Sequence, residues 1–113
     1  MFLYWIDKER FGGGSQPHLS DLPFLHVPIP DFGVPTKSDF DSIRVFFEKY
    51  QDEKPGIPIL VHCTAGNGRT GTILASLIKI LDNIKSSVAI QRVREVNPLA
   101  IETDKQEAFI DEL

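Results

Sequence analysis

The residues with the clearest potential for chemistry are Cys63 and Arg69, which are separated by five residues in a glycine-containing stretch. A cysteine thiolate is a strong nucleophile, and its pKa falls when nearby backbone amides and positive charge favour the ionised form. The planar guanidinium of an arginine can bind two oxygens of one phosphoryl group at once. The pair therefore predicts a nucleophile and an anion clamp that act on the same phosphate.

The stretch around this pair predicts a strand, a tight loop and a helix. The apolar run 57–61 precedes the loop, and an apolar run suited to a buried helix follows Arg69. Gly66 and Gly68 permit backbone angles that other residues avoid. Successive backbone N–H groups and the positive end of the helix then form an anion site. The expected phosphate-binding residues are Thr64, Ala65, Gly66, Asn67, Gly68 and Arg69.

Residues 62–71 resemble the Cys-x5-Arg signature of the cysteine-dependent protein tyrosine and dual-specificity phosphatases. The matching positions are His62, Cys63, Gly66, Gly68, Arg69, Thr70 and Gly71. The resemblance, closest to the compact dual-specificity branch, implies a phosphatase-like α/β fold. It also implies hydrolysis of phosphotyrosine in protein, with phosphoserine and phosphothreonine as further substrates, through a phosphocysteine intermediate on Cys63.

The same resemblance extends to the proline-rich segment that contains Asp31. In the family, an aspartate preceded by proline on a mobile loop protonates the leaving oxygen, and Pro30-Asp31 resembles that arrangement. Ile29 stands where the family often has tryptophan. Taken alone, Asp31 is an aspartate in a turn between prolines; beside the signature loop, it is the expected general acid.

Three further residues acquire roles from the resemblance. Thr70 corresponds to the hydroxyl residue that steadies the thiolate as it leaves in the second step. His62 corresponds to the histidine that orients the loop, and a histidine in the core is the simpler alternative. Gln106 corresponds to a glutamine that positions the attacking water, and a helix-capping glutamine is an equally good interpretation.

Two other phosphate-binding motifs overlap the loop and are disfavoured. Residues 66–71 also match G-x-G-x-x-G, the dinucleotide fingerprint, but residues 84–96 predict a helix where a second strand is required. That reading also leaves Cys63 and Arg69 without a task. A Walker A loop is excluded because no lysine precedes Thr70.

Other functions remain as alternatives within the resemblance. Phosphoinositide phosphatases tend to carry lysines in this loop, where Thr64 and Asn67 are neutral. RNA 5′-triphosphatases tend to place asparagine directly before the arginine, where this chain has Gly68. A non-catalytic phosphoprotein-binding module would not need Cys63. No cofactor or metal is expected, since the three histidines show no paired ligand spacing; the expected partners are phosphorylated proteins.

Composition agrees with one ordinary globular domain over residues 1–113, with 42% hydrophobic and 25% charged residues. A formal charge of −4 argues against general nucleic-acid or acidic-membrane binding. The single cysteine suits a reducing compartment. The N-terminal apolar stretch is too short for a signal peptide or a membrane span, so a cytoplasmic location is expected.

Strands alternate with helices in the pattern, which predicts an α/β fold with a mainly parallel central sheet flanked by helices. Strands are expected at Met1–Ile6, Phe24–Ile29 and 59–62, with a hairpin partner near Arg10–Gly12. A helix capped by Thr36 or Ser38 is expected to run to about Gln51, with Pro55 and Gly56 ending it. Further helices are expected at Arg69–Leu81, at Ser86–Val96 with Ser86 as its cap, and at Thr103–Leu113 with a capping box of Thr103 and Gln106. A brief helix onset is expected at 17–22. The run Gly12–Ser15 predicts a turn or loose loop. The family usually has another helix and strand before the acid segment, so the N-terminal part is expected to be shortened or incompletely represented.

Overall fold

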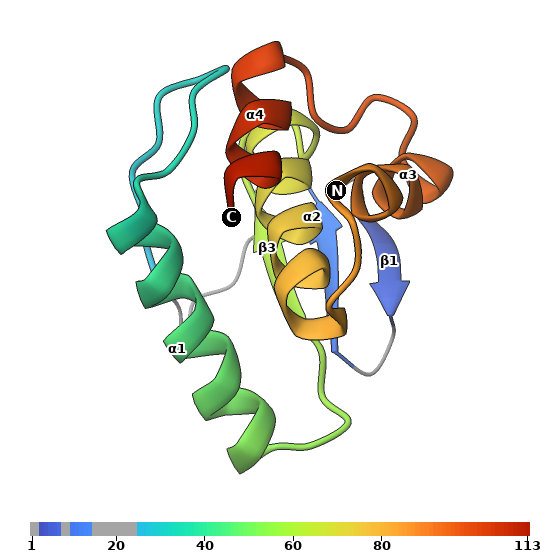
Figure 1. The fold of residues 1–113 in the computed structure, drawn as a ribbon. Helices are drawn as coiled ribbons and strands as arrows, with labels where there is room; N and C mark the ends of the chain where they lie inside the picture. Colours follow the sequence, from blue (N-terminus) through green and yellow to red (C-terminus); the bar gives the residue numbers. More distant parts are fainter. Residues whose placement is uncertain (1–2, 8–9, 15–24) are drawn as a thin grey trace.

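A computed structural model describes residues 3–7, 10–14 and 25–113 (Figure 1). Its strands are β1 (Leu3–Asp7), β2 (Phe11–Gly14) and β3 (Ile59–His62). Its helices are α1 (Lys37–Glu53), α2 (Gly68–Asp82), α3 (Ser86–Val96) and α4 (Asp104–Glu112). The expected helix onset at 17–22 lies outside the described residues, as does most of the segment expected to be shortened.

The sheet of the described residues is mixed, with the order β1-β2-β3. β1 and β2 are antiparallel, whereas β2 and β3 are parallel with Phe11 opposite Ile59 and Gly14 opposite His62. The predicted mainly parallel sheet is therefore not confirmed, and β2 rather than β3 is its central strand. The reason is the short connection after β1, because closely spaced strands pair antiparallel and only the long crossover through α1 allows parallel pairing.

The glycines of β2 show that the predicted turn or loose loop over Gly12–Ser15 is wrong for residues 12–14. All of β2 is buried. A Cβ added to Gly12 would lie 2.5 Å from the ring of Trp5, and one on Gly13 would lie 2.6 Å from Tyr4 and 2.8 Å from Leu74. Because these glycines have no side chain, Trp5, Tyr4 and Leu74 can pack directly against the strand. The glycines are therefore required by tertiary packing and do not mark a turn.

The predicted strand at Phe24–Ile29 is also wrong over its described part, because residues 25–30 have no regular secondary structure. Pro28 and Pro30 lack the backbone N–H that a strand donates to its ladder. The segment instead runs toward Asp31, where Gly33 N–H donates to Pro30 O at 2.8 Å and closes a turn. Phe32 occupies this turn with a φ of 60°, a strained angle for a large side chain.

Helix α1 begins as the sequence predicts, with Thr36 as its N-cap. The Thr36 hydroxyl accepts from Asp39 N–H at 3.0 Å, and the Asp39 carboxylate accepts from Thr36 N–H at 3.1 Å, which forms a capping box. Phe40 and Phe47 are buried on its apolar face. The helix ends before Pro55 and Gly56, as expected.

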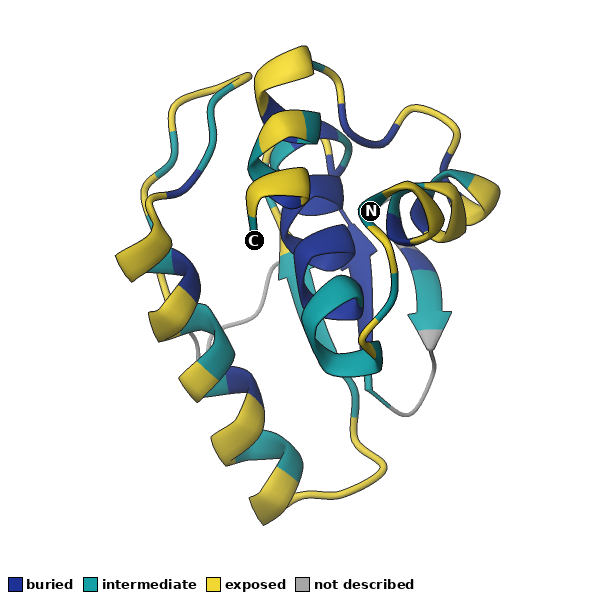
Figure 2. Ribbon diagram, in the orientation of Figure 1, coloured by how far each residue is buried: buried dark blue, intermediate teal, exposed yellow. Residues whose placement is uncertain are grey.

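Helix α2 is the centre of the molecule and positions the Cys63 loop. It packs against β2 and β3 and also against α3 and α4 (Figure 1). Every residue from Thr70 to Ile78 is buried, so the helix appears dark along its first turns in Figure 2. Two of its buried hydroxyls donate within the helix: Thr72 to Gly68 O and Ser76 to Thr72 O, both at 2.7 Å.

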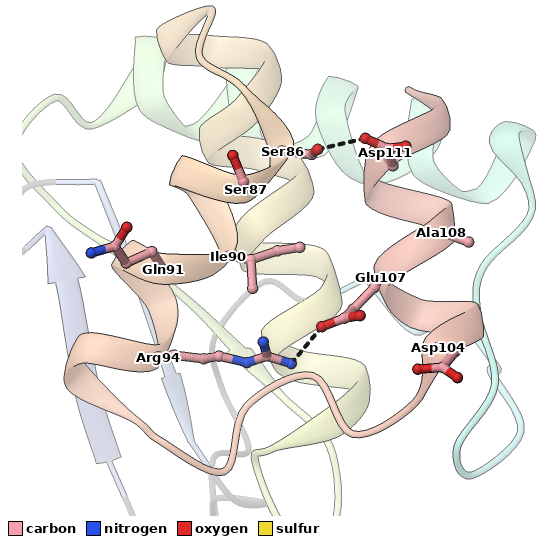
Figure 3. A pocket seen from close by; sticks show the side chains of 9 residues that line it. All are labelled: Ser86, Ser87, Ile90, Gln91, Arg94, Asp104, Glu107, Ala108 and Asp111. Carbon is pink, nitrogen blue, oxygen red and sulfur yellow. Dashed lines mark hydrogen bonds and ion pairs between the residues drawn. The ribbon is translucent and has the colours of Figure 1, made fainter.

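The two C-terminal helices follow the predicted ranges with one difference in capping. Thr103 and Gln106 form the predicted capping box of α4. Ser86, however, is not the N-cap of α3; that position belongs to Lys85, which makes no side-chain cap. The Ser86 hydroxyl instead donates to Asp111 Oδ1 at 2.6 Å and ties α3 to α4 (Figure 3).

An open hollow of about 700 Å³ lies between α3 and α4. An ion pair at 2.9 Å from Arg94 to Glu107 crosses it (Figure 3). None of its lining residues belongs to the Cys63 loop. Over the described part of the chain, no helix has the length and apolar character that a membrane span requires.

Candidate active site

Cys63 follows β3 directly, and residues 63–67 turn the chain into α2. Gly66 has a φ of 82°, a left-handed conformation that glycine adopts without penalty. The cysteine is half-buried, whereas Thr64 and Ala65 are exposed and Gly66 is buried. The loop is therefore open on one side and anchored to the protein on the other.

A side-chain hydroxyl and a loop amide are among the groups that donate to the sulfur of Cys63. Thr70 Oγ1 lies 2.9 Å from Sγ, and the Gly66 N–H nitrogen lies 3.2 Å from it. Burial raises the pKa of the Cys63 thiol, but the hydrogen bonds from Thr70 and Gly66 and the charge of Arg69 outweigh it. The pKa of the thiol is lowered as a result, which favours the nucleophilic thiolate.

The start of α2 adds further donors. Its first hydrogen bond runs from Gly71 N–H to Asn67 O at 2.9 Å, so the amides of residues 68–70 have no acceptor within the helix. Asn67, the N-cap residue, makes no side-chain cap. The amide of Thr70 donates to Cys63. The sulfur thus lies at the positive end of a helix, where it accepts from the backbone amides of Gly66 and Thr70.

Arg69 connects this loop to the segment that contains Asp31. Arg69 Nη1 donates to Ile29 O at 3.0 Å, and Nη2 lies 3.7 Å from Asp31 Oδ1. Asp31 is largely exposed, and its Oδ1 also accepts from Phe32 N–H at 3.1 Å. The structure therefore brings Cys63, Thr70, Arg69 and Asp31 to one side of the molecule.

Gln106 lies at the base of the Asp31 turn and is fully buried. Its Oε1 accepts from the N–H groups of Glu102 at 2.7 Å and Thr103 at 3.2 Å, and its Nε2 donates to Gly33 O at 3.2 Å. The amide thus joins the start of α4 to the acid segment. The structure shows the capping interpretation of Gln106; its water-positioning role stays a prediction.

His62 lies beside the loop but is not brought to the sulfur. The residue is exposed, and no hydrogen bond joins its ring to another described residue. Partial burial of the ring lowers the pKa of His62, which favours the neutral form. Its predicted role in orienting the loop stays a prediction. Among the described residues, no cluster of three or more histidine, cysteine, aspartate or glutamate side chains could hold a metal ion.

Sequence reasoning missed three residues that contact this region: Tyr4, Asn97 and Glu102. Tyr4 Oη donates to Gly66 O at 3.0 Å, and Asn97 Nδ2 donates to Asn67 Oδ1 at 2.9 Å. A Cβ added to Gly68 would collide with a carboxylate oxygen of Glu102. All three come from segments far from the loop in sequence, so no local spacing indicated them.

The family of the chain follows from this geometry and from comparison with known proteins. Residues 18–110 match the model of the family described as "Swiss Army Knife protein, DSP-PTPase phosphatase domain" (PTP-SAK). The match covers most of the chain. The chain therefore belongs to this family of phosphatase domains, as the resemblance in the sequence predicted.

Individual relatives agree with this assignment. The chain is 43% identical over 91 residues to the uncharacterized protein MJ0215 of Methanocaldococcus jannaschii, covering 80% of the chain and 55% of the relative. It is 33% identical over 104 residues to human receptor-type tyrosine-protein phosphatase H, covering 85% of the chain and 9% of the relative. The chain thus spans just over half of the archaeal relative and a small part of the receptor.

A solved structure covers nearly the whole fold. The crystal structure of Tk-PTP in the active form superposes with a TM-score of 0.81 at 25% sequence identity, covering 98% of this chain and 95% of that chain. The compact four-helix arrangement around a small mixed sheet is therefore the fold of a protein tyrosine phosphatase.

Proposed function

We propose that residues 1–113 act as one catalytic domain that hydrolyses phosphate monoesters, with phosphotyrosine in protein as the first substrate class and phosphoserine or phosphothreonine as the second. The observation that carries the proposal is the set of donors on Cys63 Sγ, namely Thr70 Oγ1 at 2.9 Å and Gly66 N–H at 3.2 Å. They favour a thiolate at the end of the loop, where the free amides of α2 can bind the phosphoryl oxygens.

In the first step, the Cys63 thiolate attacks phosphorus and forms a sulfur–phosphorus bond while the bond to the leaving oxygen breaks. Asp31 gives its proton to that oxygen. The loop amides and the guanidinium of Arg69 stabilise the charge on the equatorial oxygens. The support for these roles is the position of Arg69 between the loop and Asp31.

In the second step, water attacks the phosphocysteine and Asp31 takes a proton from the water. The sulfur–phosphorus bond breaks and inorganic phosphate forms. The departing thiolate is stabilised by the hydroxyl of Thr70, which already donates to Sγ. The step uses no metal or cofactor, because the loop amides and Arg69 supply the positive field.

The test is turnover without added metal on a panel of phosphotyrosine and phosphothreonine peptides, phosphoinositides and 5′-triphosphate RNA. Phosphate release should be fastest from the peptides and should disappear in Cys63→Ser, which keeps the loop amides. Ser76→Ala, which alters a buried hydroxyl of α2 away from the loop, is the matched control and should retain activity. Phosphate release by Cys63→Ser above the rate without enzyme would remove the mechanism.

A further inference from the structure

The carbonyl oxygen of Gly66 points into the protein, where it meets two buried donors. Tyr4 Oη donates to it at 3.0 Å, and Asn97 Nδ2 lies 3.4 Å from it. The exposed fractions of Tyr4 and Asn97 are only 6% and 3%. The two donors come from β1 and from the residue after α3, so distant segments converge on one peptide of the loop.

This contact fixes the direction of a backbone donor. No peptide bond of the described residues is cis, so the N–H of Asn67 points opposite to the carbonyl of Gly66. Because that carbonyl is held toward Tyr4 and Asn97, the Asn67 amide faces away from the interior. The Gly66 amide already points at Cys63 Sγ. The two consecutive amides therefore differ in what orients them: the Gly66 amide is held by the sulfur, and the Asn67 amide by the contacts of the Gly66 carbonyl.

Asn97 also forms a hydrogen bond with the side chain of Asn67. Asn67 is the N-cap of α2, where an asparagine oxygen usually accepts from the second or third amide of its own helix. Here the Asn67 backbone is helical, with φ −108° and ψ −76°, rather than extended as in a capping residue. Its Oδ1 accepts from Asn97 Nδ2 at 2.9 Å, and the residue makes no cap. Asn97 is itself held in place, because its Oδ1 accepts from Leu99 N–H at 3.2 Å.

The absence of a side-chain cap at Asn67 matters because such a cap would accept from the amide of Arg69 or Thr70. The Thr70 amide donates to the sulfur of Cys63, and the Arg69 amide has no acceptor within α2. If Asn67 Oδ1 took either amide, it would compete with the thiolate or with a bound anion. A cap that usually stabilises a helix is here kept away from the anion site.

We propose that Asn97 and Tyr4 are positioning residues for the proposed phosphatase reaction: together they direct the Asn67 amide toward the phosphate, and Asn97 also prevents Asn67 from capping α2. The inference rests on the proposed function only for its kinetic consequences. The inference also makes a prediction that does not depend on catalysis, namely the affinity of the loop for an oxyanion, which can be measured without turnover.

The test measures binding of inorganic phosphate by calorimetry in Tyr4→Phe, Asn97→Ala, Asn67→Ala and the double variant Asn67→Ala with Asn97→Ala. Asn97→Ala should weaken phosphate binding about 10-fold, the scale of one hydrogen bond to a charged group, and Tyr4→Phe should weaken it less, about 5-fold. In the double variant, much of the loss should be recovered because no side chain remains to cap α2. Ser76→Ala, which loses a buried hydrogen bond elsewhere in α2, should bind phosphate as the unaltered protein does.

A second readout separates positioning from general destabilisation. The pH midpoint for alkylation of Cys63 by iodoacetamide should rise in Asn97→Ala and return in the double variant, whereas a loss of stability alone would lower the melting temperature without this pattern. Phosphate affinity in Asn97→Ala equal to that of the unaltered protein, or an equal loss in the double variant, would overturn the inference.

Failure of the positioning role can be distinguished from failure of the proposed function. If the unaltered protein releases no phosphate from p-nitrophenyl phosphate but Asn97→Ala still loses phosphate affinity and the double variant recovers it, the proposed function fails and the positioning role stands. If the unaltered protein turns over and the variants bind phosphate normally, only the positioning role fails.

Discussion

At the scale of single residues, the sulfur of Cys63 is governed by the balance between burial and donated hydrogen bonds. Burial raises its pKa, and the hydroxyl and amide of Thr70, the amide of Gly66 and the charge of Arg69 lower it further than burial raises it. The hydroxyl of Thr70 donates to Sγ at 2.9 Å. A substitution that removes only this hydroxyl therefore tests the balance directly.

Thr70→Val should move the pH midpoint for alkylation of Cys63 upward. The folded protein favours the thiolate, so this ionisation stabilises the fold above the ordinary thiol pKa, and the contribution is lost as pH falls through the lowered value. The variant should accordingly lose part of that pH dependence. Thr72→Val is the matched control, because Thr72 Oγ1 donates to Gly68 O and not to sulfur. An unchanged midpoint in Thr70→Val would mean that the amides and the charge of Arg69 set the pKa without the hydroxyl.

Asp31→Asn should lower kcat by about 10²- to 10⁴-fold on phosphotyrosine peptides, the range for a positioned general acid. The loss should be smaller for p-nitrophenyl phosphate, because its leaving group needs less protonation. Asp52→Asn, which alters an exposed carboxylate near the end of α1, is the control and should be nearly neutral. Equal losses on both substrates would place the acid at another residue, with Asp39 and Asp41 as the next candidates.

At the scale of elements, the site depends on the close approach of α2 to the segment that leads into α4. Gly71 lies on the first turn of α2, and Ile101 N–H donates to Asn67 O at 3.3 Å just before it. A Cβ on Gly71 would lie 2.8 Å from Ala100 Cβ and 3.0 Å from Ile101 N. Gly71 therefore allows the Cys63 loop to lie close to the segment that leads into α4.

Gly71→Ala should destabilise the fold by about 1–3 kcal/mol, the usual effect of overpacking a core. A helical alanine would otherwise be favourable, so a loss of stability isolates the steric term. Adding Ala100→Gly removes the atom that is closest to the new methyl group and should recover part of the loss. Urea unfolding measures both variants, and a Gly71→Ala variant as stable as the unaltered protein would contradict the close approach.

At the scale of the whole molecule, the first strand contacts the Cys63 loop through one buried side chain. Tyr4 packs in the main core together with Phe11, Leu74 and Val93 while its hydroxyl reaches Gly66. Burial raises the pKa of Tyr4 to about 12, an effect that the hydrogen bond with Asn97 opposes and the nearby Cys63 charge reinforces. Global unfolding should therefore depend on the ionisation of this phenol.

The neutral form of Tyr4 is favoured in the fold, so its contribution to stability is complete below the unfolded value near ~10. The contribution is then lost as pH rises through about 12. Over that window the free energy of unfolding should fall by roughly 2–3 kcal/mol, at 1.36 kcal/mol for each unit of pKa difference. Tyr4→Phe should remove this part of the decline, and Tyr50→Phe on α1 is the control. An identical decline in Tyr4→Phe would show that other groups cause it.

The sequence by itself determined the features that depend on neighbouring residues. Residue types within a few positions of each other were enough to predict the loop between β3 and α2 and the capping box at Thr103. They also predicted where α1 and α3 end, and they offered Thr36 as one of two caps for α1. The family was also evident from ten consecutive residues, because the chemistry of a phosphate loop requires glycines, a cysteine and an arginine at fixed spacing.

Only the tertiary structure decided the features that depend on distant partners. Gly12–Gly14 resembles a turn until Trp5, Tyr4 and Leu74 are seen to occupy the space of its missing side chains. The parallel pairing of β2 with β3 and the burial of Asn97 against the loop likewise have no local signature. Their physical cause is packing and hydrogen bonding between segments far apart in the chain, which residue spacing along the sequence does not encode.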